Sequence, residues 1–534
     1  PAAWRLGLAA VVRELLGRAG LAGREVGSVG LASQVDGVVP TDDGLRPLRD
    51  AVIWLDRRAT RQAEALARRV GEQELFEITG LNCDASHTAP KIMWLAEPEP
   101  ALYRSARWLL PVGSYLVAWL TGAVVVDPAN ASSTLVYDVA KGGWSELLLD
   151  AAGIDGALLP EIRPATDVAG GLTVEAAGLL GLRPGCPVVV GTGDDHSAAL
   201  AAGLLRPGLV VDVTGTAEPV GAVAAELTLD PERLVETHAH AVAGALLVEN
   251  PGFVSGGSTL WLAESVLRCR QADLLALAAT APAGSDGVLF LPALSGATAP
   301  RWNDRMRGAF AGLGMNHGGA ELARAVLEGC AYALRDIVDR LAALGLAGGP
   351  AHGAAHDPAR ASAHNPARGA AHDPTHDPAH ASAHNPAGGA AHDPAGGSGR
   401  HPAGGSARDP ARDPAGDQAG RPTGDPAGAR PGDEAGDEVR VVGGGARSPL
   451  WLQIKADVLN RPVRSVLAQE PTAVGAAMLA GVSAGMFADL DDAVARTVAI
   501  APEPVRPDQA RADRYAECYA NYRRLYDGVE RSTG

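Results

Sequence analysis

Pro187-Val-Val-Val-Gly-Thr-Gly-Asp-Asp-His-Ser-Ala-Ala-Leu200 is the stretch around which the rest of this chain of 534 residues is organised. Residues 188–190 are three consecutive valines between a proline and a glycine, which predicts a buried strand. The Gly-Thr-Gly turn at residues 191–193 ends this strand and leaves Asp194 at its carboxyl end. The small residues from 197 to 203 then predict a closely packed helix.

A second strand is predicted over residues 209–213, where Leu-Val-Val-Asp-Val runs into Thr214-Gly215-Thr216. A glycine turn of this kind can present backbone N–H groups to phosphate oxygens. A carboxylate and a phosphate-sized turn therefore follow two successive strands. This pairing indicates a general base beside a phosphoryl donor.

The opening stretch resembles the catalytic segment of the FGGY family of carbohydrate kinases, in which a Gly-Asp supplies the base and a Gly-Thr turn holds the phosphates of ATP. Gly308-Ala-Phe-Ala-Gly-Leu313, a gap of seven residues and Glu321-Leu-Ala-Arg-Ala-Val-Leu-Glu-Gly329 match the second signature of the family. Ser86-His-Thr-Ala-Pro-Lys-Ile-Met-Trp-Leu-Ala-Glu97 matches the first signature until Pro98. Gly443-Gly-Gly-Ala-Arg-Ser-Pro-Leu-Trp-Leu-Gln-Ile-Lys-Ala-Asp457 resembles its adenosine-binding turn and helix. Within the family the chain most resembles the xylulose kinases.

Strands that end in glycine turns alternate with helices, which indicates an α/β protein with a ligand crevice at the carboxyl ends of the strands. The resemblance implies two actin-like, ribonuclease-H-like ATPase domains around a cleft that closes over both substrates. We expect a sugar-binding domain over residues 1–203 and a nucleotide-binding domain over residues 204–348 and 438–534.

The composition changes abruptly between the two parts of the second domain. Residues 349–437 are rich in Ala, Gly, Pro, Asp and His, contain a direct repeat of twenty residues and carry nine of the fourteen histidines. No segment there has a hydrophobic face that could offset the entropy of ordering it, so we expect a long disordered insert. The histidines could bind transition metals loosely, although a neutral repeat expansion is the simpler interpretation.

Composition and charge exclude several classes of protein. Hydrophobic residues make up 46% of the chain, and a net charge of −16 without a cluster of basic and aromatic residues argues against nucleic acid as a partner. Five cysteines scattered singly indicate a reduced, cytoplasmic protein. No apolar run approaches ~20 residues and no leader opens the sequence, so we expect neither membrane insertion nor secretion. A homodimer is an assembly that the sequence leaves open.

The resemblance implies that Asp194 is the catalytic base, which accepts the proton of the attacking sugar hydroxyl. Asp195 is its rival, and both carboxylates could instead cap the helix after Gly193. A short strand predicted over residues 26–31 leads to the turn where the family contacts its sugar. The Asp36 carboxylate there can accept hydrogen bonds from two hydroxyls, or it can merely cap the turn. The expected substrate contacts are Gln34, Val35, Asp36, Asp56, Arg57 and Asp195.

Asp56 and Arg57 belong to Trp54-Leu-Asp-Arg-Arg58, which resembles a Trp-x-Asp-x-Arg segment near the substrate cleft of the family. Asp56 could equally be the N-cap of the helix that runs through Arg69.

The resemblance implies nucleotide contacts from three glycine turns, with ATP and Mg²⁺ as cofactors. The amides of Gly215 and Thr216 are expected to steady the γ-phosphate, while Mg²⁺ neutralises the triphosphate without an assigned set of protein ligands. His238 and His240 would share one face of a strand, but the sequence offers no third metal ligand nearby. The remaining nucleotide contacts expected are Gly257, Gly443, Gly444, Gly445 and Ser448.

In the family, a hairpin with an Asp-x-Gly-Thr phosphate turn precedes the helix that begins near Trp4 here. No such turn precedes Trp4 in this sequence, so we expect the opening strands to be absent and phosphate transfer to be impaired. D-xylulose is the first substrate to expect, with another ketose, a polyol or gluconate as alternatives. A family member that binds sugar without phosphorylating it, and a metal-handling protein built on the histidine repeats, also stay open.

Overall fold

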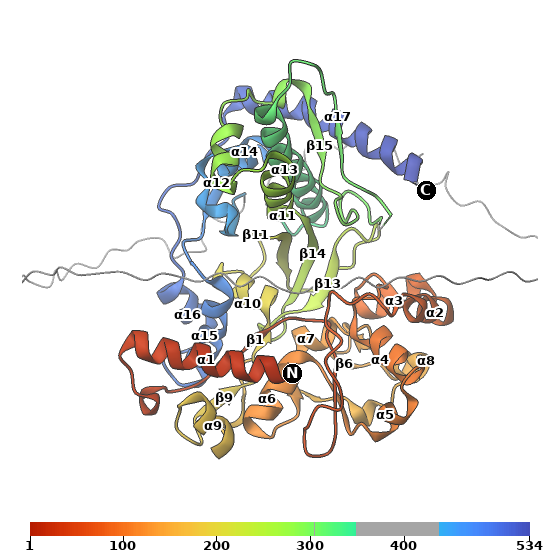
Figure 1. Ribbon diagram of the computed structural model, residues 1–534, viewed down its shortest axis with the longest axis vertical. Helices are drawn as coiled ribbons and strands as arrows, with labels where there is room; N and C mark the ends of the chain where they lie inside the picture. Colours follow the sequence, from red (N-terminus) through yellow and green to blue (C-terminus); the bar gives the residue numbers. More distant parts are fainter. Residues whose placement is uncertain (304, 349–436, 534) are drawn as a thin grey trace, which may run out of the picture. The chain divides into compact units, whose positions relative to one another are not determined.

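The computed structural model describes residues 1–303, 305–348 and 437–533. The insert predicted over residues 349–437 lies outside these ranges except for Asp437. The described residues form a mixed α/β protein (Figure 1), as the alternation of strands and helices predicts. No helix in these ranges is long and apolar enough to cross a membrane.

Ten short strands in residues 1–203 pair two by two, in the combinations β1–β10, β2–β3, β4–β7, β5–β6 and β8–β9. The strands are β1 (Ala32–Ser33), β2 (Val39–Thr41), β3 (Trp108–Leu110), β4 (Val125–Val126), β5 (Tyr137–Asp138), β6 (Gly143–Trp144), β7 (Glu161–Ile162), β8 (Val168–Gly171), β9 (Pro187–Val189) and β10 (Thr192–Gly193). The helices are α1 (Ala2–Ala19), α2 (Thr60–Val70), α3 (Glu72–Thr79), α4 (Thr88–Ala96), α5 (Pro100–Ser105), α6 (Val112–Thr121), α7 (Pro128–Ser132), α8 (Glu146–Ala152), α9 (Val174–Leu180) and α10 (Asp194–Ala201).

The strand predicted over residues 188–190 is present, but a glycine divides it into β9 and β10. Gly191 has a φ of 78°, and a Cβ atom there would lie 2.3 Å from the carbonyl oxygen of Leu31. Only glycine combines this left-handed backbone with such a close approach. The kink lets β10 pair with β1 while β9 pairs with β8.

A six-stranded sheet in the order β13-β14-β12-β11-β17-β18 is the centre of the C-terminal half. The predicted strand at residues 209–213 is β11, shifted by one residue. The strands are β11 (Val210–Thr214), β12 (Ala217–Ala224), β13 (Glu236–Ala239), β14 (Leu246–Val254), β15 (Leu289–Leu291), β16 (Ala309–Ala311), β17 (Val439–Gly443) and β18 (Val463–Ser465). The helices are α11 (Gly256–Leu260), α12 (Gln271–Ala278), α13 (Gly319–Ala343), α14 (Pro449–Leu459), α15 (Pro471–Ser483), α16 (Leu490–Thr497) and α17 (Gln509–Thr533).

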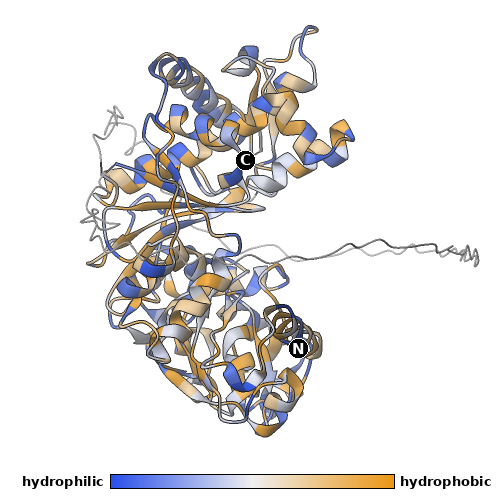
Figure 2. Ribbon diagram, turned by 90° about the vertical axis from the view of Figure 1, so that its left-hand side faces the viewer, coloured by the Kyte–Doolittle hydropathy of each residue, from blue (hydrophilic) through white to orange (hydrophobic). Residues whose placement is uncertain are grey.

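The largest hydrophobic core lies in the C-terminal half, around α13. This helix approaches β15 so closely that a Cβ atom on Gly329 would lie 2.3 Å from the carbonyl oxygen of Phe290. Many helices carry both hydrophobic and hydrophilic segments (Figure 2), as expected of elements that bury one face and expose the other. This close contact fixes α13 against the β15–β16 pair.

Two local predictions near the N-terminus differ from the structure. The strand predicted over residues 26–31 is not regular: Val29 makes one parallel bridge to Val188, and the regular pairing begins with β1. The spacing of Trp4, Leu8, Val11, Val12 and Leu15 predicts an apolar face on the first helix, but this face is only partly buried, since Val11 and Leu15 are 53% and 58% exposed. Hydrophobic periodicity placed the helix correctly without determining which apolar residues the neighbouring elements cover.

Candidate functional site

Two loops that lie far apart in the sequence begin at the same edge of one strand pair. Strands β1 and β10 run parallel, with Ala32 opposite Thr192 and Ser33 opposite Gly193. Because the carboxyl ends of parallel strands meet at one edge, the loop at residues 34–36 and the start of α10 become neighbours. A Cβ atom on Gly193 would lie 2.8 Å from Val35 Cγ1, so the two loops are in close contact.

Asp194 is the first residue of α10, and the residue keeps only part of its surface open to solvent. Its Oδ1 accepts a hydrogen bond from the Asp195 amide (3.2 Å), and its carbonyl accepts one from Thr472 Oγ1 (3.2 Å). Loss of surrounding solvent, together with the adjacent Asp195 carboxylate, raises the pKa of Asp194 to about 7. A carboxylate with a pKa near neutrality is well matched to accepting a proton from a hydroxyl group.

Asp195 is less exposed than Asp194, and its Oδ1 accepts a hydrogen bond from the His196 amide (2.7 Å). Burial raises the pKa of Asp195 despite this hydrogen bond. Neither aspartate is the N-cap of α10, because Gly193 occupies that position. Both lie in the first helical turn, where the helix dipole favours negative charge.

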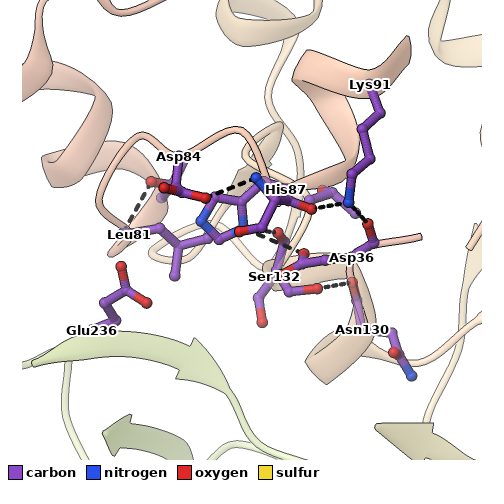
Figure 3. A network of polar contacts seen from close by, with 12 residues as sticks. Asp36, Leu81, Asp84, His87, Lys91, Asn130, Ser132 and Glu236 are labelled. Atoms are coloured by element: carbon purple, nitrogen blue, oxygen red, sulfur yellow. Dashed lines mark hydrogen bonds and ion pairs between the residues drawn. The ribbon is translucent and has the colours of Figure 1, made fainter. Parts of the chain in front are cut away.

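Asp36 has a left-handed backbone with a φ of 61°, and its side chain faces the buried His87. Figure 3 shows the polar network around this pair: His87 Nδ1 lies 3.3 Å from Asp36 Oδ1 and 2.8 Å from the Ser133 carbonyl oxygen. Burial lowers the pKa of His87, but the Asp36, Glu236 and Asp84 carboxylates together outweigh burial and raise it to about 9. The Asp36 carboxylate is thus held in place by a charged partner.

Lys91 is fully buried and holds the same loop by its backbone. Its Nζ donates to the carbonyl oxygen of Asp36 (2.5 Å) and to that of Ser86. Burial lowers the pKa of Lys91 to about 8. Both bonds are to backbone carbonyls, so this lysine positions the loop at residues 34–36.

Asp56 and Arg57 each form an ion pair, and neither of them caps a helix. Arg57 pairs with Asp84 at 2.6 Å, in the same loop as His87, and Asp56 pairs with Arg58 at 2.6 Å. The alternative that Asp56 is an N-cap is wrong, because α2 begins at Thr60 and Ala59 precedes it without a side-chain cap. The hydrogen bond from Arg58 holds the pKa of Asp56 below its usual value.

Strand β13 of the C-terminal half brings polar residues to this region that we did not predict as site residues. Glu236 Oε1 accepts a hydrogen bond from the Asn82 amide (2.8 Å), and the Thr237 amide donates to the Gly80 carbonyl oxygen (2.9 Å). Burial raises the pKa of Glu236 to about 7. The only sequence signal for this contact is the alternation of Glu236, His238 and His240.

His238 of β13 and His240, which directly follows the strand, both lie near His196, with ring centroids 5.7 Å and 6.5 Å from that of His196. Burial lowers the pKa of His196 to about 4 and those of His238 and His240 to about 3. Within the described ranges, no three His, Cys, Asp or Glu side chains are arranged to hold a metal ion. These imidazoles are therefore neutral parts of the interior.

The expected nucleotide residues converge on the end of β11, where Thr214 lies opposite Gly443 of β17. Cβ atoms on Gly443 and Gly445 would lie 2.7 Å from the Thr214 carbonyl oxygen and 2.4 Å from its Cγ2. A Cβ atom on Gly256 would lie 2.3 Å from the carbonyl oxygen of Gly215. Glycine is thus required at these three positions, because the three turns approach one another too closely for a side chain.

The three turns are also joined by hydrogen bonds. The amides of Gly256 and Gly257 donate to the carbonyl oxygens of Gly215 and Thr216, both at 3.0 Å. Gly215 and Thr216 themselves are exposed. Gly444, next to Gly443, is exposed as well. Ser448, expected as a nucleotide contact, is the N-cap of α14 and accepts a hydrogen bond from the Trp451 amide (3.3 Å).

One donor of the phosphate turn is already engaged. The Gly215 amide donates to the carbonyl oxygens of Val213 (3.0 Å) and Ala217 (2.9 Å). The Thr216 amide has no acceptor among the described residues. Of the two amides expected to meet a phosphate, only that of Thr216 is a free donor in this conformation.

Comparison with protein families and known proteins gives consistent results. The model of the FGGY family of carbohydrate kinases, N-terminal domain, matches residues 1–201, and the model of its C-terminal domain matches residues 211–484. The chain is 31% identical to a xylulose kinase of Lactococcus lactis over 340 residues, which are 64% of this chain and 68% of that protein. It is 30% identical to a glycerol kinase of Thermococcus kodakarensis over 336 residues, which are 62% of this chain and 66% of that protein.

The crystal structure of a xylulose kinase from Rhodospirillum rubrum superposes with a TM-score of 0.75 at 26% identity, covering 100% of this chain and 90% of that one. The predicted fold class is confirmed: the chain has the two-domain, actin-like fold of these proteins. The matched regions span about two thirds of the curated relatives' own length.

Proposed function

Because the chain belongs to the FGGY family of carbohydrate kinases, we propose that it transfers the terminal phosphate of ATP to a hydroxyl group of a sugar. The observation that carries this proposal is the shared edge of β1 and β10, where Gln34, Val35 and Asp36 meet Asp194 and Asp195. A polar loop suited to hydroxyl groups and a carboxylate suited to accept a proton are brought together there.

Phosphoryl transfer depends mostly on positioning and on stabilisation of charge. The Asp36 and Asp195 carboxylates accept hydrogen bonds from the sugar hydroxyls, and Asp194 accepts the proton of the attacking hydroxyl. The nucleotide lies over the glycine turns around Thr214, with the Thr216 amide directed to a phosphate oxygen. Mg²⁺, a cation that takes oxygen ligands, would be held by the triphosphate and, from the protein, by the Asp194 and Asp195 carboxylates, and it would neutralise phosphate charge.

Among acceptors we propose a ketopentose, with D-xylulose tested first. The similarity to xylulose kinases supports it, and so does the charge of the site. Asp194 and Asp195 place two adjacent carboxyl groups at the start of α10, whereas Asp36 is paired with His87, and like charges disfavour a further anion beside the two aspartates. A sugar acid such as gluconate therefore suits this edge less well than a neutral ketose or polyol. The similarity to glycerol kinases makes glycerol the second acceptor to test.

A coupled assay of ADP release over ketoses, polyols, glycerol and gluconate tests the proposal. We expect release that depends on the acceptor, with D-xylulose giving the highest kcat/KM and gluconate the lowest. An Asp194→Asn variant purified in parallel measures the background of contaminating kinases. Release that is equal with and without acceptor, or equal in the two proteins, would contradict the proposal.

A further inference from the structure

Lys455 of α14 is a fully buried lysine at the foot of the phosphate turn, and its role is not explained by the site described so far. Its Nζ donates to Asp212 Oδ2 (2.5 Å), Thr214 Oγ1 (2.5 Å) and Glu218 Oε1 (3.0 Å). An ammonium group has three protons, so each of them has an acceptor here. Asp212 and Glu218 are likewise fully buried.

The acceptors of Lys455 lie on both sides of the turn that carries Gly215 and Thr216. Asp212 and Thr214 end β11, and Glu218 lies in the second position of β12. Thr214 Oγ1 also donates to Asp212 Oδ1 (2.9 Å). Lys455 thus binds both the end of β11 and the start of β12, the two strands that the turn connects.

The network continues to the second glycine turn through Ser255. The Ser255 hydroxyl donates to Glu218 Oε2, and the Ser255 amide donates to the Thr216 carbonyl oxygen (3.1 Å). Gly256 and Gly257, which follow, bind the carbonyl oxygens of the phosphate turn. The third turn, at residues 443–445, leads through Ser448 into α14 itself. All three glycine turns are therefore linked to one buried ammonium group.

The charges of the network indicate that its role is geometric. Two carboxyl groups surround one ammonium group, so the network adds no positive charge that would attract a phosphate. Ion pairs taken out of water are costly, and well-packed apolar residues of the same volume commonly stabilise a core better. What an ion network supplies, and an apolar core does not, is a set of directed bonds that hold particular atoms in place.

We propose that Lys455 is a positioning residue that holds the Thr214-Gly215-Thr216 turn in the conformation that receives the phosphates of a nucleotide, and that Ser255 extends this hold to Gly256 and Gly257. The inference rests on the proposed nucleotide site. It assigns Lys455, Asp212, Glu218 and Ser255 to binding of the phosphates rather than of the adenosine or the sugar.

The test compares nucleotide affinities in variants that leave Lys455 intact, because its removal would leave two buried carboxylates unpaired and endanger folding. Ser255→Ala removes the bond between Glu218 and the second turn, and Glu218→Gln keeps the shape but removes the charge. Calorimetric titrations of the full chain with ATP, ADP and adenosine give the dissociation constants. We expect Kd to rise about three- to tenfold for ATP and ADP, as for loss of one buried hydrogen bond, and to stay within about twofold for adenosine.

Tyr515→Phe is the matched control. Tyr515 is also fully buried in the C-terminal half, and its hydroxyl donates to Glu328 Oε1 (2.7 Å) in a network that does not include the glycine turns. It should lower the melting temperature as Ser255→Ala does while leaving all three Kd values unchanged. Equal losses of ATP and adenosine affinity in the Ser255 and Glu218 variants, or no loss at all, would overturn the inference. A wild-type chain that binds no nucleotide would instead refute the proposed function.

Discussion

Gly193→Ala is the substitution that disturbs the proposed site most selectively. The backbone of Gly193 has φ −63° and ψ 156°, which any residue adopts, so alanine introduces no backbone strain. Its methyl group would lie 2.7 Å from Asp195 Oδ1, 2.8 Å from Val35 Cγ1 and 3.0 Å from His196 Cδ2. The Val35 and Asp195 side chains must therefore shift, which disturbs the contact between the loop at residues 34–36 and the first turn of α10.

Overpacking of this kind costs about 1–3 kcal/mol of stability. The effect on transfer is larger, because a misplacement of about 1 Å can cost about 10²-fold in rate. We expect Gly193→Ala to lower kcat/KM for the sugar about 10- to 100-fold and to change the Kd of ATP little, since the nucleotide turns lie on other strands.

Initial rates of ADP release and urea unfolding of the same preparations measure the two effects. Gly178→Ala is the matched control: Gly178 lies within α9 and a Cβ atom there meets nothing within 4 Å. Alanine at that position should raise the unfolding free energy by about 0.5–1 kcal/mol and leave kcat/KM unchanged. A Gly193→Ala protein with kcat/KM within twofold of wild type would refute the claim that contact between these two loops organises the sugar site.

Three further outcomes are expected. Gly191→Ala should cost more stability than Gly193→Ala in urea unfolding, because it adds left-handed strain to a 2.3 Å contact with the Leu31 carbonyl oxygen, and an equal cost would contradict this. The His87 pKa is raised to about 9 by Asp36, Glu236 and Asp84 despite burial, so the stability that this histidine contributes, about 3 kcal/mol, is complete below pH 6.5 and is lost as the pH rises through 9. Between pH 6 and pH 9.5 the unfolding free energy of wild type should therefore fall by about 3 kcal/mol more than that of His87→Gln. An equal fall in the two proteins would show that His87 is not the group responsible. Replacing residues 349–437 by a short Gly/Ser linker should leave activity and melting temperature nearly unchanged, whereas a fall of about ten degrees or more would mean that the insert stabilises the fold.

The sequence predicts a structural feature well where all the residues that determine it lie in one short segment. Valines bounded by proline and glycine predict β9, and the Gly-Asp that follows predicts a carboxylate at a strand end. The three glycine turns were identified by resemblance, and their close packing around Thr214 explains why glycine stands at each. Their roles toward ATP stay predictions.

Features that depend on long-range contact could not be predicted in this way. Glu236 meets Asn82 only because an edge strand of the C-terminal sheet lies against a loop of the N-terminal half. Asp56 precedes a helix, as an N-cap residue would, but its carboxylate instead forms an ion pair with Arg58. Lys455 reads as one polar position in a helix, and only the fold reveals that it ends between two carboxylates.

The pH dependence of phosphate transfer in wild type, Asp194→Asn and Asp195→Asn tests the central claim most directly. The claim is that Asp194 accepts the proton of the sugar hydroxyl. Since its pKa is raised to about 7, the carboxylate is protonated and inactive below that pH and becomes a base above it. We predict that kcat/KM of wild type for the accepted sugar rises with pH to a plateau, with its midpoint near 7. Asp194→Asn should lose about 10² to 10⁴ in kcat at every pH while its Kd values for sugar and ATP stay close to those of wild type. An Asp194→Asn protein that keeps more than about a tenth of the activity, while Asp195→Asn loses the activity and the pH dependence, would contradict the assignment of the base.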